Sequence, residues 1–213
     1  MERYVPFEDG EFYHVYNRGI DKRKIFFSDK DWEVFLSLLF GRNSKKRIDL
    51  PVLLGGSWRS VDRGDTLVDI VAYALMPNHF HLLVYEKELG GTTTFMRKLL
   101  TSYSMYMNKK YDRTGPLMCR PFRAKHVDSD EYFRWLIAYI HANPIELHDK
   151  EWKDKGIKDV VATKEFLGTY RFSSYHDYFI QERDETSILN KASLPITIDD
   201  LEDVAVAVST LTL

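Results

Sequence analysis

The stretch Met76-Pro-Asn-His-Phe-His-Leu-Leu-Val84 decides how this chain folds and where its chemistry lies. After the Pro77-Asn78 turn it is apolar apart from its two histidines, so it predicts a β-strand from residue 79 onward. Because alternate side chains of a strand share a face, His79 and His81 point one way while Phe80 points the other. Two imidazoles in register on a rigid strand are half of a metal site. The other interpretation is a half-buried strand that carries two solvated histidines.

The same kind of pattern predicts the elements around this strand. Residues 67–76 form a second strand, joined to 79–86 as a hairpin, and further strands are expected at 11–17 and 121–127. Helices are expected at 29–41, 91–111 and 128–143. Ser28 or Asp29 caps the first helix, and Asp128 caps the last in a capping box with Glu131. Residues 42–66 are polar and contain glycine, which predicts an irregular excursion with a short apolar piece at 52–54.

The helix at 128–143 carries a second pair of candidate side chains. Tyr132, Leu136, Tyr139 and Asn143 recur at helical spacing and therefore lie along one face. Tyr139 and Asn143 are one turn apart, roughly 6 Å along the helix axis. A tyrosine hydroxyl is a nucleophile, and an asparagine amide oxygen is a hard metal ligand. Periodicity alone favours a plainer interpretation, a core tyrosine and an asparagine that ends the helix before Pro144, since the residue before a proline is pushed out of the α region.

The net charge of −2 hides an asymmetry between the two parts of the chain. Residues 1–126 contain 21 Lys and Arg against 15 Asp and Glu, whereas residues 127–213 contain 9 against 17. Between residues 97 and 125, basic side chains alternate with tyrosine and phenylalanine. Single-stranded nucleic acid needs this combination, because phosphates take the charge and bases stack on the rings. The candidates for phosphate contacts are Lys98, Lys109, Lys110, Arg113, Arg120 and Arg123. Solvated surface charge is the other interpretation.

Composition limits the class of protein. At 213 residues, 44% hydrophobic and 29% charged, the chain suits one globular domain, or one domain with a tail. One cysteine, Cys119, excludes an internal disulfide and fits a reducing compartment. The first residues contain no apolar leader, and no apolar run reaches membrane-spanning length. A cytoplasmic protein without a membrane partner is expected.

These motifs together resemble a known family. The segment from Ala74 to Val84 looks like the histidine–hydrophobic–histidine (HUH) motif of single-tyrosine transposases. The segment Tyr139-Ile-His-Ala-Asn143-Pro resembles the tyrosine-bearing helix of the REP-associated tyrosine transposases. The stretch from Arg97 to Arg123 is similar to that family's middle segment, and Tyr170-Arg-Phe-Ser-Ser-Tyr175 resembles a downstream element. Together the matches span about residues 12 to 178.

The resemblance implies a fold and a site. The fold is α+β and ferredoxin-like, with a mainly antiparallel central sheet flanked by helices. Its domain would cover residues 1–180, followed by an acidic extension, residues 181–213, with a short apolar repeat at 204–208. Tyr139 would be the catalytic nucleophile, and His79, His81 and Asn143 would hold a divalent metal, Mg²⁺ or Mn²⁺. Tyr132 and His14 are candidates for supporting roles at this site.

The resemblance also implies an activity. The protein would cleave and rejoin single-stranded DNA beside a hairpin through a 5′-phosphotyrosine intermediate, as a monomer or a homodimer. Two alternatives stay open: a domesticated, catalytically silent DNA- or RNA-binding regulator, and a metal-dependent hydrolase that uses activated water. A covalent adduct that depends on Tyr139 separates the first activity from both alternatives.

Overall fold

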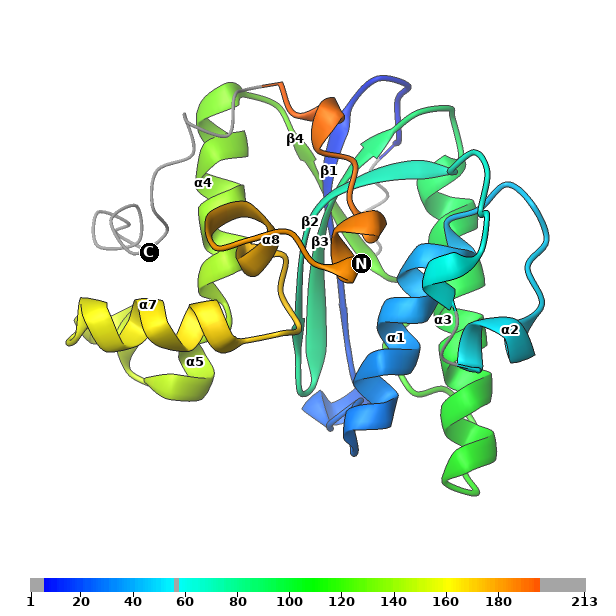
Figure 1. Ribbon diagram of the computed structural model, residues 1–213, viewed down its shortest axis with the longest axis horizontal. Helices are drawn as coiled ribbons and strands as arrows, with labels where there is room; N and C mark the ends of the chain where they lie inside the picture. Colours follow the sequence, from blue (N-terminus) through cyan, green and yellow to red (C-terminus); the bar gives the residue numbers. More distant parts are fainter. Residues whose placement is uncertain (1–5, 56–57, 196–213) are drawn as a thin grey trace.

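A four-stranded antiparallel sheet forms the centre of the molecule in the computed structural model, which describes residues 6–55 and 58–195 (Figure 1). The strands are β1 (Phe12–Arg18), β2 (Val68–Met76), β3 (His79–Glu86) and β4 (Arg123–Val127). Their order is β2-β3-β1-β4, and each neighbouring pair is antiparallel. With α1 after β1 and α3 after β3, the chain follows the βαββαβ order of ferredoxin-like folds. The α+β fold predicted from the sequence is confirmed.

Helices lie on both faces of this sheet (Figure 1). The long helices are α1 (Asp29–Arg42), α3 (Gly91–Lys110) and α4 (Asp130–Ala142). The shorter helices are α2 (Leu50–Leu54), α5 (Ile145–His148), α6 (Trp152–Lys155), α7 (Val160–Thr169) and α8 (Tyr175–Phe179). Single 3₁₀ turns form η1 (Ile20–Lys22), η2 (Trp58–Ser60), η3 (Asp184–Ile188) and η4 (Lys191–Ser193). None of the helices in the described ranges combines the length and apolar character that crossing a bilayer requires.

Strand alternation divides the core between the two faces. On one face Phe80 of β3 contacts Phe35 of α1, with ring centroids 5.1 Å apart, and α3 packs beside α1. On the other face Phe12 of β1 meets Phe133 of α4 at 4.9 Å. Burying a large apolar side chain of this kind contributes about 1.5–3 kcal/mol. The sheet therefore has no fully solvated face, and α4 is fixed over the face that carries the two histidines.

The two edges of the sheet differ. Residues 170–178 cover the β2 edge: the Phe172 carbonyl accepts from Leu75 N–H at 2.9 Å, the Tyr73 carbonyl accepts from Ser174 N–H at 2.9 Å, and Tyr178 Oη donates to the Val71 carbonyl at 2.7 Å. The β4 edge carries exposed Arg123 and Lys125 instead. Basic side chains on an open edge discourage pairing with another strand and leave charge available to a ligand.

The helix boundaries correct two predictions. The Ser129 hydroxyl, not the Asp128 carboxylate, caps α4 by accepting from Tyr132 N–H. Asn143 precedes a proline but keeps α-helical angles, φ −50° and ψ −42°, because Pro144 leads directly into α5. A proline at the start of a helix loses no hydrogen bond there. The helix ends next to the expected place, but the conformation expected for Asn143 was wrong.

The described residues of the predicted excursion, 42–55 and 58–66, form more defined structure than the polar sequence indicates. Leu53 of α2 packs so closely on Gly41 that a Cβ on this glycine would collide with it. The Asn43 side chain bonds to both the N–H and the carbonyl of Val68, at 3.0 and 2.9 Å. The excursion is thus anchored to α1 and to the start of β2.

The described part of the predicted C-terminal extension also packs on the domain. Arg59 and Arg171 both donate to the Glu185 carboxylate, at 2.8 and 2.9 Å. Asn190 N–H donates to the Ile70 carbonyl at 2.9 Å. The apolar repeat at 204–208 lies outside the described residues.

Asp31 joins α1 to α3. Its fully buried carboxylate accepts hydrogen bonds from Lys110, Tyr106 and Tyr111 of the α3 region, at 2.7 to 2.8 Å, and from the N–H groups of Phe27 and Ser28. Burial alone would raise the pKa of Asp31, but the hydrogen bonds from Lys110, Tyr111 and Phe27 outweigh it and lower this pKa to about 2. The folded state therefore favours the charged carboxylate.

We expect Asp31→Asn to lower the free energy of unfolding by about 3 kcal/mol, because Lys110 loses its anionic partner and the buried amide nitrogen that replaces one carboxylate oxygen cannot accept the hydrogen bonds made there. Since the pKa of Asp31 is lowered on folding, its contribution is complete above the unfolded value of 3.8 and is lost as the pH falls toward 2. Urea unfolding at neutral and acidic pH measures both effects. Asp29→Asn, an exposed carboxylate of the same first turn, is the control; equal losses from both variants would contradict the assignment.

Candidate functional site

The two histidines of β3 lie on the sheet face that α4 covers. Strand pairing places His81 opposite Tyr16 and His79 opposite Arg18. The imidazole centroids of His79 and His81 are 5.1 Å apart, and the Tyr139 ring of α4 lies 5.6 Å from His81. The structure therefore brings together the residues of both sequence motifs, which are about sixty positions apart in the chain.

The hydrogen bonds of His79 determine which nitrogen is free. Its Nδ1 lies 2.6 Å from Asn78 Oδ1. The Asn78 amide is oriented by its Nδ2, which donates to the Lys22 carbonyl at 3.2 Å. Because Asn78 Oδ1 can only accept, Nδ1 of His79 carries the proton and Nε2 presents a lone pair. That is the state of a histidine prepared to bind a metal ion.

His81 contacts His14 of β1 through a ring nitrogen. His14 Nε2 and His81 Nδ1 are 2.8 Å apart in a buried contact. If His81 Nδ1 donates in this contact, its Nε2 is free in the same way as that of His79. Burial lowers the pKa of His81 well below 6.5, and the neighbouring His14 and His79 lower it further. Burial likewise lowers the pKa of His14 to about 4. Both rings are thus neutral near pH 7, which metal ligation requires.

Asn143 offers a third candidate ligand atom beside the two histidines. Its Nδ2 donates to the Tyr139 carbonyl at 2.7 Å, which turns Oδ1 away from the helix. Within the described residues, this buried Oδ1 has no hydrogen-bond partner. Burial lowers the pKa of His79, and the Asn143 side chain lies close enough to oppose that shift. A buried, unpartnered carbonyl oxygen beside two imidazole lone pairs is a donor set that fits a divalent cation.

The acidic residues do not offer a competing metal site. In the part of the chain that the structure describes, no group of three or more His, Cys, Asp or Glu side chains is arranged to hold an ion. The amide oxygen of Asn143 stays a predicted third protein ligand, and its chemistry fits that role. We could identify it from the sequence only through the family resemblance, since spacing alone favoured a helix cap. In the structure Asn143 is the C-cap of α4, which leaves its Oδ1 free to serve as the predicted metal ligand.

Tyr139 is half-buried between aromatic rings. Trp135 stacks against it with centroids 4.9 Å apart and planes 8° apart. His14 and His81 meet it edge to face at 6.2 and 5.6 Å. Tyr132, which the sequence suggested as a supporting residue, stacks on Trp135 at 5.6 Å and does not reach Tyr139 itself. Trp135 is a neighbour of the site that our sequence analysis missed.

The six residues predicted to contact phosphates lie in different parts of the structure. Lys98 donates to the Ser44 carbonyl and Lys110 to Asp31; both belong to α3, on the face opposite the histidines. The end of α3 and the turn after it carry Lys109 and Arg113, and Arg120 lies in the loop before β4. Of the six, only Arg123 is shown by strand register to share the histidine face, since it pairs with Tyr16.

Lys125 belongs with Arg123, although it was not among the predicted contacts. It pairs with His14, and its Nζ lies 4.0 Å from the centroid of the Tyr132 ring. The period of two along β4 was the signal that could have found it, because Arg123 and Lys125 necessarily share a face. The other five predicted contacts have no geometric link to Tyr139 and stay predictions.

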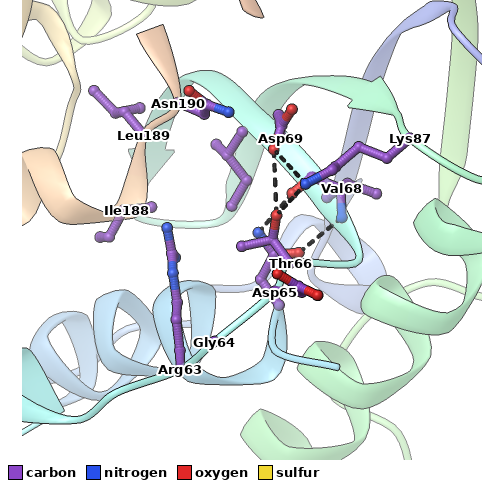
Figure 2. A pocket seen from close by; sticks show the side chains of 12 residues that line it. Arg63, Gly64, Asp65, Thr66, Val68, Asp69, Lys87, Ile188, Leu189 and Asn190 are labelled. Carbon is purple, nitrogen blue, oxygen red and sulfur yellow. Dashed lines mark hydrogen bonds and ion pairs between the residues drawn. The ribbon is translucent and has the colours of Figure 1, made fainter. Parts of the chain in front are cut away.

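A cavity of about 330 Å³ lies at the other end of the β2–β3 hairpin (Figure 2). Its polar groups are bonded mainly to one another: Asp69 accepts from Thr66 at 3.2 Å and Ser193 at 2.7 Å, and it pairs with Lys87 at 3.4 Å. The length of β3, about 23 Å at the usual rise per residue, separates this end of the strand from His79. The cavity is therefore not part of the histidine–tyrosine site.

Comparisons with known proteins agree with this arrangement. Residues 64–143, which contain both histidines, Tyr139 and Asn143, match the model of the family described as IS200-like transposases. Among solved structures, the REP-associated tyrosine transposase bound to a REP hairpin is similar in fold, with a TM-score of 0.54 and 12% sequence identity, and the match covers 87% of this chain and 90% of that one. No curated protein sequence matches the chain.

We expect His14→Ala to weaken Mn²⁺ binding about 10- to 100-fold, because His81 loses the partner that orients its ring. Isothermal titration at neutral pH, beside His79→Ala, measures the affinity. His126→Ala is the control, since His126 on β4 bonds to Glu11 and is not one of the site's rings. An unchanged affinity in His14→Ala would contradict a supporting role for this residue.

Proposed function

We propose that this chain cleaves and rejoins single-stranded DNA with Tyr139 as the nucleophile, since its residues 64–143 match the model of the IS200-like transposase family. The family supports a transposase-type role in DNA processing. The observation that carries the finer proposal is the position of the Tyr139 ring, 5.6 Å from His81, beside a set of neutral imidazole and amide donors. A nucleophile and a cation site at this separation can act on the same phosphate group.

His79, His81 and Asn143 would hold the cation in this proposal. A divalent ion bound there would act as a Lewis acid on oxygens of the scissile phosphate. Two imidazole ligands favour Mn²⁺ or another transition ion, while Mg²⁺ is the usual partner of phosphates. The protein's contribution is a rigid strand, neutral rings and an amide oxygen kept free of other partners.

Tyr139 would perform the covalent step. Its phenolic oxygen loses its proton and forms a bond to phosphorus, while the bond from phosphorus to the 3′-oxygen breaks and that oxygen takes up a proton. The products are a 5′-phosphotyrosyl link and a free 3′-hydroxyl. Because the link keeps the phosphodiester bond energy, attack by another 3′-hydroxyl rejoins the strands and releases Tyr139.

The DNA would approach along the β4 side of the site. The similar solved transposase is bound to a REP hairpin, which supports a hairpin beside the cleaved strand as substrate. Arg123 and Lys125 share the histidine face and are exposed, so they can contact phosphates of a strand that reaches Tyr139. No membrane partner is required, and both a monomer and a homodimer are compatible with one site in each chain.

We expect a covalent protein–DNA adduct when the protein is incubated with labelled hairpin DNA that has single-stranded flanks and with Mn²⁺ or Mg²⁺. Tyr139→Phe should reduce adduct formation and cleavage about 10³-fold or more, because the attacking oxygen is gone. Denaturing gels detect the label at protein size. Tyr85→Phe, on the same strand as the histidines but toward its far end, is the control. Chelation of the metal should abolish the adduct in the unmodified protein.

Two results would contradict this proposal and favour one of the alternative functions. Cleavage at a normal rate by Tyr139→Phe, without an adduct, would identify a hydrolase that uses activated water. Binding of hairpin DNA without any cleavage, across a varied hairpin pool, would identify a catalytically silent regulator.

A further inference from the structure

The Tyr139 ring is oriented by ring contacts. In the described ranges no side-chain hydrogen bond involves its hydroxyl, so nothing polar fixes the phenol. Trp135 lies parallel to it at 4.9 Å, and the edge-to-face contacts with His14 and His81 meet the same ring. Rotation of the phenol away from the histidines would therefore break the stack with Trp135.

The stack extends beyond Trp135. Tyr132 lies on the same helix face, three residues earlier, and stacks on Trp135 at 5.6 Å with planes 21° apart. Lys125 of β4 places its Nζ 4.0 Å from the Tyr132 ring centroid, a cation–π contact. Tyr132, Trp135 and Tyr139 thus form a column, hereafter the aromatic column, that begins at the β4 edge and ends at the nucleophile.

Helix geometry explains why the column is regular. Residues at i, i+3 and i+7 project from one side of an α-helix, so the three rings follow one another along α4. The intervening residues Phe133, Leu136, Ile137 and Ile140 are buried and fix the helix on the sheet. Trp135 is partly buried against the same core, and its ring stacks on Tyr132 and on Tyr139.

We propose that Trp135 is a positioning residue for Tyr139: its parallel ring holds the phenol in the rotamer that faces His79, His81 and Asn143. This inference rests on the proposed function, in which Tyr139 is the nucleophile. In-line attack needs the attacking oxygen within a narrow range of distance and direction, and a misplacement of about 1 Å can cost about 10²-fold in rate. An indole ring supplies this restraint without a hydrogen bond that would have to break during attack.

The test separates the rate of the covalent step from binding. Under single-turnover conditions with hairpin DNA, Trp135→Ala and Trp135→Leu should slow adduct formation about 10- to 100-fold. The Kd for the DNA and the Mn²⁺ affinity should stay unchanged. Trp135→Phe should restore most of the rate, because a phenyl ring still stacks on the phenol while leucine supplies only apolar volume.

Trp32→Leu is the matched control. Trp32 also stacks between aromatic rings, Phe26 at 3.9 Å and Phe172 at 4.6 Å, but it belongs to α1 and does not touch the site. Its substitution should lower the urea midpoint and leave the rate per folded molecule unchanged. Because Trp135→Leu and Trp32→Leu both remove a stacked indole, a general loss of stability would affect both.

Three results would overturn the inference, and they differ from failure of the proposed function. A normal rate in Trp135→Ala, with an active unmodified protein, would show that Trp135 does not position Tyr139. A loss of DNA affinity as large as the loss of rate would make Trp135 a base-stacking contact. Equal rates for Trp135→Phe and Trp135→Leu would show that stacking is irrelevant. Absence of any adduct in the unmodified protein would instead reject the proposed function, and the inference with it.

Discussion

The antiparallel pairing of β1 with β3 is the constraint on which the rest of the site depends. In this register Tyr16 lies opposite His81, and His14 is one diagonal step away, with its Nε2 2.8 Å from His81 Nδ1. A shift by one residue would turn His79 and His81 to the face that α1 and α3 cover. The burial of Phe80 and Leu82 on that face opposes such a shift, so the apolar core determines where the imidazoles point.

The residues of the site come from two elements, β3 and α4. The histidines stand on a central strand and are fixed by side-chain partners, Asn78 and His14. Tyr139 and Asn143 come from the end of α4, where the chain turns directly into α5. Asn143 connects the two elements, because its Nδ2 donates to the Tyr139 carbonyl and its side chain lies close to His79. Burial lowers the pKa of His14 and His81 and so keeps both rings neutral near pH 7, and among the described residues it leaves the Asn143 amide oxygen without a hydrogen-bond partner.

Local patterns located most elements, and the errors have identifiable causes. Ser28 and the apolar spacing of 29–41 predicted α1 correctly, since a cap and an amphipathic face are both local signals. The polar stretch 42–66 was expected to be irregular because its order comes from distant partners, namely Gly41 for Leu53 and Val68 for Asn43. Asn143 departed from the usual conformation before a proline because a second helix begins at that proline.

Local sequence patterns were enough to predict that His79 and His81 share a face and that Tyr139 and Asn143 lie one turn apart, because periods of 2 and 3.6 residues follow from backbone geometry. Only the tertiary structure decided which groups meet across the chain. It placed His14 under His81, Trp135 against Tyr139 and Lys125 over Tyr132, and it engaged Lys98 and Lys110 in internal bonds. The physical reason is that strand pairing and helix packing bring together residues far apart in sequence, and a local pattern contains no information on such a partner.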